Sequence, residues 1–181
     1  MAMFAVGIDL GGTKVAIGLV DSARNVVAIS QTTTGISADF HETSAEIVTR
    51  INEVCTSVPR EQVIGIGVGV AGQVDSATGT VRASPNLPTW NDVPLQAKLQ
   101  ERLELPVLIN NDVRAAALGE WQYGAGQGAT DMICLFVGTG IGGGIIAAGR
   151  LLTGCNGSSG ELGHTVIERN GPECRCGSRG H

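Results

Sequence analysis

The sequence has little charge for its length and no excess of basic residues. Of its 181 residues 16% are charged, with 12 Lys and Arg against 17 Asp and Glu, so the formal net charge is −5. Because a phosphate backbone is bound by clustered Lys and Arg, this balance argues against a nucleic-acid partner. The sequence also lacks an apolar run long enough to cross a bilayer. We therefore expect a globular protein with neither a nucleic-acid nor a membrane partner.

A secretion signal is also missing, and the cysteines fit that absence. Residues 1–4 carry no basic segment of the kind that begins a signal peptide. The five cysteines are an odd number, which favours free thiols in a reducing cytoplasm. Cys174 and Cys176 are separated by one residue, a spacing that favours a metal site over a disulfide. We expect a cytoplasmic protein.

Glycine is abundant, with 27 residues, and it separates short apolar runs. The pattern predicts helices at 41–54, 95–103 and 112–122 and a proline-rich loop at 84–94. It also predicts strands at residues 4–10, 15–20, 25–32, 63–70, 107–110, 132–137 and 144–148. This order predicts an α/β fold, a mixed sheet with flanking helices. The pattern restarts near residue 110, so we expect an N-terminal lobe at 1–110 and the start of a second lobe at 111–181.

The first glycine turn follows the first predicted strand and includes Asp9, Gly11, Gly12, Thr13 and Lys14. Glycines leave backbone N–H groups open to phosphate oxygens, while the hydroxyl and the ammonium add donors. The Asp9 carboxylate suits hydrated Mg²⁺. The turn is neither a Walker loop nor a dinucleotide fingerprint, because it leads into a strand and lacks their spacing. The alternative is an ordinary hairpin turn.

A second glycine loop runs over residues 138–144 and includes Gly138, Thr139 and Gly140. A loop with so few side chains lets a ligand touch the backbone. Two such loops predict a clamp for the phosphates of a nucleotide, although a flexible turn is the alternative for each.

Asn111 and Asp112 stand at a predicted strand-to-helix junction. A carboxylate there can take a proton from a sugar hydroxyl as it attacks a γ-phosphate. The alternative is a helix N-cap formed by Asn111 or Asp112. In the proline-rich loop the Asn86 amide suits hydrogen bonds to sugar hydroxyls, and Trp90 either stacks on a sugar ring or fills the core.

The glycine-rich tail holds four potential metal ligands. Thiolates and imidazoles in a tight knuckle suit structural Zn²⁺, and the candidates are His164, Cys174, Cys176 and His181. The alternative is a reduced, solvated tail.

Together these motifs closely resemble the ROK family of sugar kinases and repressors. The resemblance rests on the segments 9–14, 67–72, 86–90, 111–120, 138–144 and 160–164 with the cysteine knuckle, in family order over residues 6–181. It implies an actin-like ATPase (ribonuclease H-like) fold with two lobes, and Asp112 as catalytic base. It implies a sugar site of Asn86, Asn111, Asp112, Glu161 and His164. It also implies phosphate loops containing Asp9, Gly11, Gly12, Thr13, Lys14, Thr139 and Gly140, and zinc ligands His164, Cys174 and Cys176.

Two departures from the family pattern affect these expectations. His181 stands where the knuckle of the family has its last Cys, which predicts two imidazoles and two thiolates around zinc. The chain is also much shorter than family members, so we expect an incomplete second lobe. A truncated product, a fragment, or completion by dimerisation would each explain this length, and we expect a homo-oligomer.

The resemblance implies an ATP-dependent hexose kinase that phosphorylates glucose at C6 in the presence of Mg²⁺. N-acetylmannosamine, N-acetylglucosamine, mannose or fructose as acceptor and polyphosphate as donor stay open. One alternative is a sugar-binding regulator, although only eight residues precede Asp9, too few for a DNA-binding module, and the phosphate loops are intact. Another is a non-catalytic remnant that binds zinc and sugar.

Overall fold

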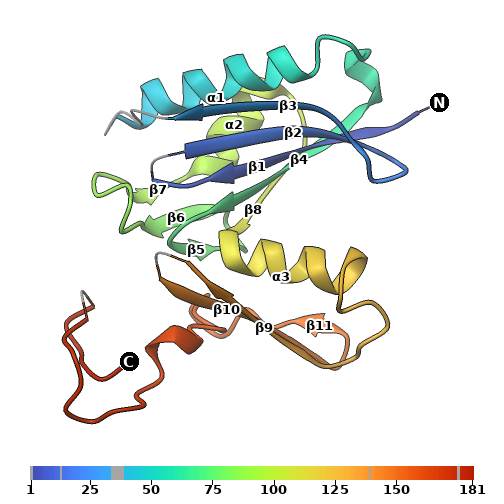
Figure 1. Cartoon of the computed structure of the whole chain (residues 1–181). Coiled ribbons are helices and arrows are strands. Elements are labelled where there is room, and N and C mark those ends of the chain that lie inside the picture. Colours follow the sequence, from blue (N-terminus) through green and yellow to red (C-terminus); the bar gives the residue numbers. More distant parts are fainter. Residues whose placement is uncertain (1, 13, 34–38, 139, 175) are drawn as a thin grey trace. The chain divides into compact units, whose positions relative to one another are not determined.

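The computed structural model describes residues 2–12, 14–33, 39–138, 140–174 and 176–181 (Figure 1). The chain divides into two compact units, unit 1 (Met1–Ala115) and unit 2 (Ala116–His181). Within the described residues, no helix has both the length and the apolar character that crossing a membrane requires. The five cysteines all lie among the described residues, and none of them forms a disulfide.

Unit 1 is built on a five-stranded mixed sheet of strand order β3-β2-β1-β4-β8. The first three strands form an antiparallel meander, and β1, β4 and β8 are parallel. Their bounds are Phe4–Leu10 (β1), Lys14–Asp21 (β2), Val26–Thr33 (β3), Val63–Val70 (β4) and Val107–Asn111 (β8). The short 3₁₀ helix Arg60–Gln62 (η1) precedes β4. The predicted mixed sheet is confirmed.

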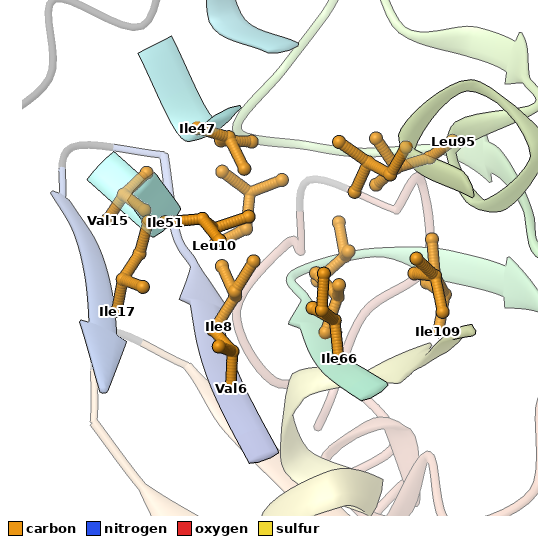
Figure 2. Packing of buried hydrophobic residues seen from close by; sticks show 14 of the residues in the cluster. Val6, Ile8, Leu10, Val15, Ile17, Ile47, Ile51, Ile66, Leu95 and Ile109 are labelled. Carbon is orange, nitrogen blue, oxygen red and sulfur yellow. The ribbon is translucent and has the colours of Figure 1, made fainter. Parts of the chain in front are cut away.

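The core of unit 1 lies on one face of this sheet. Along β1 the buried residues alternate with exposed ones, so Val6, Ile8 and Leu10 point to the same side. Two helices, Phe40–Val54 (α1) and Leu95–Leu103 (α2), cover that side and bury their own apolar residues against it (Figure 2). Burying each large aliphatic side chain contributes about 1.5–3 kcal/mol, so this layer is the main source of stability in unit 1.

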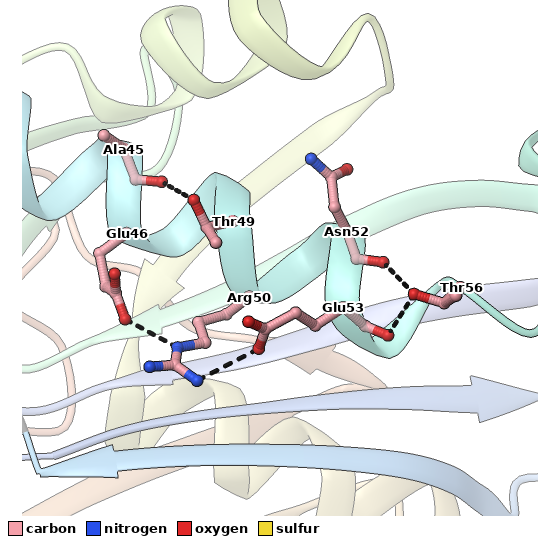
Figure 3. A network of polar contacts seen from close by, with 7 residues as sticks. All are labelled: Ala45, Glu46, Thr49, Arg50, Asn52, Glu53 and Thr56. Carbon is pink, nitrogen blue, oxygen red and sulfur yellow. Dashed lines mark hydrogen bonds and ion pairs between the residues drawn. The ribbon is translucent and has the colours of Figure 1, made fainter.

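The opposite side of α1 is polar and solvated. Asp39 caps the helix by accepting a hydrogen bond from the His41 N–H at 2.6 Å. Arg50 forms ion pairs with Glu46 (2.7 Å) and Glu53 (3.2 Å), one turn away on either side (Figure 3). Such exposed pairs each contribute at most about 1 kcal/mol, so packing and not charge holds α1 on the sheet.

A second, three-stranded sheet of order β5-β6-β7 extends unit 1. Its strands are Gln73–Asp75 (β5), Thr80–Ala83 (β6) and Asn91–Val93 (β7). The Arg82 guanidinium bridges the outer strands, to Asp75 at 2.8 Å and Asp92 at 2.9 Å. The prediction of one continuous loop over 84–94 is wrong at its end, because Asn91 and Val93 pair with Ala83 and Val81 of β6.

Unit 2 contains a three-stranded antiparallel sheet of order β11-β10-β9, formed by Met132–Val137 (β9), Ile141–Ala147 (β10) and Arg150–Leu151 (β11). The helix Asp112–Tyr123 (α3) begins in unit 1 and ends in unit 2. The 3₁₀ helix Leu162–His164 (η2) follows the sheet in the chain. Strand β10 begins at Ile141, three residues before the predicted start, because the glycines at 142–144 pair with β9 and do not form an open turn.

Candidate functional site

The carboxyl ends of the three parallel strands of unit 1 bring polar residues to one edge of the sheet. Asp9 on β1 lies beside Gly69 on β4, and Gly69 lies beside Asn110 on β8. In open α/β sheets this edge is where ligands bind. A Cβ on Gly69 would lie 3.2 Å from the Asp112 Cα, so the glycine lets the first turn of α3 approach the sheet closely.

Asn111 organises the start of α3. Its Oδ1 accepts a hydrogen bond from the Arg114 N–H at 3.1 Å, which makes Asn111 the N-cap. Its Nδ2 donates to the Gly72 carbonyl at 3.1 Å and to the Asp112 Oδ1 at 2.9 Å. Of the two predicted caps the structure therefore shows Asn111, and the Asp112 carboxylate is not needed to cap the helix.

Asp9, at the end of β1, has a perturbed carboxyl. Neighbouring protein atoms remove part of its hydration and raise its pKa, and the negative charge of Asp112 raises the pKa further. The Lys14 ammonium acts in the opposite direction. Two carboxylates that repel each other form a site where a bound cation lowers the energy of both, as the predicted Mg²⁺ would.

The first glycine turn is closed and packs directly on the loop that contains Asn86. The Gly11 N–H donates to the Lys14 carbonyl at 3.0 Å. A Cβ on Gly12 would lie 2.8 Å from the Asn86 Cγ and nearer still to the Asn86 Cβ, so only glycine fits there. The structure thus brings the predicted phosphate turn and the predicted sugar loop into contact. Thr13 lies outside the described residues.

The Asn86 loop is anchored by Ser84 and Trp90. Ser84 is 6% exposed and Trp90 is 1% exposed. The Trp90 ring packs edge-on against Phe40 at a centroid distance of 5.3 Å. Of the two readings offered by the sequence, Trp90 is a core residue.

In unit 2 the second glycine turn is short. The Gly138 N–H donates to the Gly140 carbonyl at 2.8 Å, and no described atom lies within 4 Å of a Cβ added to either glycine. Thr139 lies outside the described residues. By contrast, a Cβ on Gly143 would lie 2.7 Å from the Gly160 carbonyl oxygen, so the segment leading to Glu161 packs on the backbone of β10. This contact places Glu161 and η2 beside the strand that follows the glycine turn.

The four predicted metal ligands come together in unit 2. One ligand atom from each of His164, Cys174, Cys176 and His181 lies within 4.8 Å of the others. The Nδ1 atoms of the two histidines are 3.1 Å apart, and the Cys176 Sγ is 3.5 Å from the His181 Nε2. Ligand atoms in a tetrahedral zinc site with bonds of about 2.0–2.3 Å lie about 3.3–3.8 Å apart, so these four side chains are gathered on the scale of such a site and are of the types that zinc prefers.

The backbone around the two cysteines has the form of a knuckle. The Gly177 N–H donates to the Cys174 carbonyl at 3.0 Å, and the Cys174 N–H donates to the Ser178 carbonyl at 2.8 Å. Gly177 has a φ of +90°, a value that L side chains rarely adopt. This tight turn brings both thiols to the same side, which supports the predicted metal site over a solvated tail.

Both units match one protein family. The sequence profile of the ROK family covers residues 5–180. The chain belongs to the ROK family. The predicted resemblance is confirmed, and with it the actin-like ATPase fold that ROK kinase structures share.

Similar ROK proteins include both enzymes and regulators. The glucokinase of Thermotoga maritima is 41% identical over 175 residues, which are 97% of this chain and 54% of the relative. The xylose repressor of Caldicellulosiruptor bescii is 36% identical over 177 residues, 97% of this chain and 44% of the relative. The structure of a ROK glucokinase from Streptomyces griseus in complex with glucose and AMPPNP superposes with a TM-score of 0.84 at 37% identity, covering 98% of this chain and 55% of that one. The chain thus spans about half the length of these relatives.

The structure places the predicted site residues in two groups. Unit 1 holds Asp9, Gly11, Gly12, Lys14, Asn86, Asn111 and Asp112, and unit 2 holds Gly138, Gly140, Glu161 and the four metal ligands. The sequence analysis gave no site role to Ser84 or Gly72, which connect residues of the first group. The available signals were a hydroxyl residue two positions before Asn86 in a proline-rich loop and a glycine at the end of the family segment 67–72.

Proposed function

We propose that this ROK chain forms the acceptor-sugar site and the donor-phosphate turns of an ATP-dependent hexose kinase, with glucose as acceptor at C6. The observation that carries the proposal is the arrangement around Asn111. This residue caps α3 and donates a hydrogen bond to Asp112. The Asp112 carboxylate is therefore oriented by Asn111 and does not itself serve as the helix cap. The glucokinase relatives and the glucose complex of the S. griseus enzyme support the choice of sugar.

In this proposal Asp112 is the catalytic base. It accepts the proton of the sugar hydroxyl as that oxygen attacks the γ-phosphorus of ATP in line with the departing ADP. The hydrogen bond from the Asn111 Nδ2 fixes the orientation of the carboxylate for this step. The Asn86 and Asn111 amides hold other hydroxyls of the sugar, and orient the attacking oxygen.

The donor phosphates are held by the two glycine turns. Gly11, Gly12, Thr13 and Lys14 supply N–H, hydroxyl and ammonium donors, and Gly138, Thr139 and Gly140 supply a second set. Bound Mg²⁺ would neutralise charge on the phosphates, with Asp9 as the residue beside it.

We assign Glu161 and His164 to the sugar as well, and bound zinc would fix the position of His164. Because the His164 Nδ1 faces the metal-ligand cluster, its Nε2 is left to donate to a sugar oxygen. His181 supplies the fourth ligand. Cytoplasmic localisation and a homodimer stay predictions.

A coupled ADP-release assay with Mg²⁺-ATP tests the proposal. The acceptors are glucose, mannose, fructose, N-acetylmannosamine and N-acetylglucosamine, with polyphosphate as the alternative donor. We expect glucose turnover, and we expect Asp112→Asn to reduce kcat at least about 10²-fold while glucose still binds. Asp92→Asn, which changes an exposed aspartate of the small sheet, is the matched control. Full turnover by the Asp112→Asn variant would refute the assignment of the base.

The second candidate is a sugar-binding regulatory module, favoured by the identity to xylose repressors. The same assay separates the two. A chain that binds a sugar in calorimetry but releases no ADP with any acceptor fits the regulator, and sustained ADP release excludes it.

A further inference from the structure

The turn formed by Ala71 and Gly72, directly after β4, is held by side chains from both sides. The Ser84 Oγ donates to the Ala71 carbonyl at 2.6 Å. The Asn111 Nδ2 donates to the next carbonyl, that of Gly72, at 3.1 Å. Two neighbouring peptide groups are thus bound to residues that lie 13 and 39 positions further along the chain.

Each of these two side chains makes a second bond to a residue of the proposed sugar site. The Ser84 Oγ accepts from the Asn86 N–H at 3.3 Å. The Asn111 Nδ2 donates to the Asp112 Oδ1 at 2.9 Å. A continuous path of hydrogen bonds and one peptide turn therefore joins Asn86 to Asp112.

The turn in the middle of this path has little room to move. Gly72 has a φ of +139°, which favours glycine. A Cβ at Gly72 would lie 2.9 Å from the Ser84 Cα and 3.1 Å from the Ser84 Cβ, so the turn packs against the backbone of Ser84. Ser84 itself is 6% exposed, and water has little access to replace its hydrogen bonds.

We propose that Ser84 is a positioning residue, which sets the separation of Asn86 and Asp112 through the turn of Ala71 and Gly72. The sugar-binding part of this inference rests on the proposed function, because it takes Asn86 and Asp112 as sugar contacts. Loss of the Ser84 hydroxyl frees the Asn86 N–H and the Ala71 carbonyl together. The sugar then contacts Asn86 and Asp112 at a separation that the turn no longer fixes.

Ser44 provides a matched control in the same unit. It is 0% exposed, and its Oγ donates to a backbone carbonyl, that of His41, at 3.0 Å. It lies in α1, which belongs to the core layer and not to the site. Ser84→Ala and Ser44→Ala each delete one buried hydroxyl bound to a carbonyl, so a merely structural role predicts the same outcome for both variants.

The experiment is a calorimetric titration of the wild-type chain and both variants with glucose, without nucleotide. We expect Ser84→Ala to raise the Kd about 5–10-fold, the effect of losing one to two hydrogen bonds, and Ser44→Ala to change it less than about twofold. If Ser84→Ala does not fold, Ser84→Thr and Ser84→Val replace it, since these two side chains share a shape and differ in the hydroxyl. The threonine variant should then bind glucose more tightly than the valine variant.

An unchanged Kd in Ser84→Ala, or an equal rise in both alanine variants, overturns the proposal. Side-chain amide NMR signals of Asn86 and Asn111 give a second readout that needs no sugar. If wild-type protein binds no sugar, the proposed function fails, and the NMR signals still decide on Ser84. Shifts of the Asn111 amide in Ser84→Ala but not in Ser44→Ala support the positioning role, and unshifted signals overturn it.

Discussion

Replacing Gly12 with alanine should damage the sugar site even though Gly12 belongs to the proposed phosphate turn. The new Cβ would lie 2.8 Å from the Asn86 Cγ, and it would meet the Asn86 Cβ as well. Because non-bonded carbons pack at about 3.5–4.0 Å, the Asn86 loop or the turn must move by about 1 Å. Overpacking of this kind costs about 1–3 kcal/mol of unfolding free energy. A displacement of 1 Å at a reacting site lowers turnover by up to about 10²-fold.

Urea unfolding and glucose titration without nucleotide measure the two effects of Gly12→Ala. Gly7→Ala is the control, because it lies on β1 and no described atom comes within 4 Å of its added Cβ. We expect Gly12→Ala to be less stable and to bind glucose about tenfold more weakly, the equivalent of about 1.4 kcal/mol. Gly7→Ala should keep the wild-type affinity. A Gly12→Ala variant with wild-type stability and unchanged glucose affinity would show that the contact with Asn86 has no influence on the site.

Three further predictions concern charge, packing and metal. The pKa of Asp9 is raised in the folded protein, so its ionised form opposes folding at neutral pH, and this cost disappears as the pH falls through the raised pKa. The variant Asp9→Asn should therefore raise the unfolding free energy at pH 7 by less than about 1 kcal/mol and should weaken ATP binding. A variant less stable than the wild-type protein would contradict this prediction. Gly143→Ala should lower the stability of unit 2 by about 1–3 kcal/mol in chemical unfolding, since its Cβ meets the Gly160 carbonyl, whereas Gly138→Ala, with open space, should not. Zinc analysis by mass spectrometry should find about one Zn²⁺ per chain. The variant Cys176→Ser should lose this zinc, together with the thermal stabilisation that zinc confers. Equal metal content in both proteins would show that Cys176 is not a zinc ligand.

The main sheet of unit 1 was predictable from sequence because the periodic patterns of apolar residues extend along whole strands and helices. Strand β1 alternates buried and exposed residues over its length, and α1 repeats apolar residues with helical spacing. The small sheet was missed because its strands have three or four residues and no period. Its pairings and the bridge made by Arg82 depend on residues that meet only after folding.

The candidate site likewise contains residues that were predictable from sequence and residues whose role depends on contacts made only after folding. The sequence and the family resemblance predict Asn86, Asn111 and Asp112 as site residues, because these residue types carry the expected chemistry. Ser84 could not be identified, since its role depends on a backbone carbonyl 13 residues earlier and on the conformation of Gly72. The choice between a stacking and a core role for Trp90 likewise required its burial, because the residue type fits both.

The two tryptophans of the chain are divided between the two units. Trp90 lies in unit 1, and its indole N–H has no hydrogen-bond partner among the described residues. Trp121 lies in unit 2, and its indole N–H donates to the Ala129 carbonyl at 2.7 Å. Intrinsic fluorescence therefore offers a separate optical probe for each unit. With Trp121→Phe the emission follows unit 1, and with Trp90→Phe it follows unit 2, so a pair of denaturation curves can reveal whether the two units unfold in one transition or two.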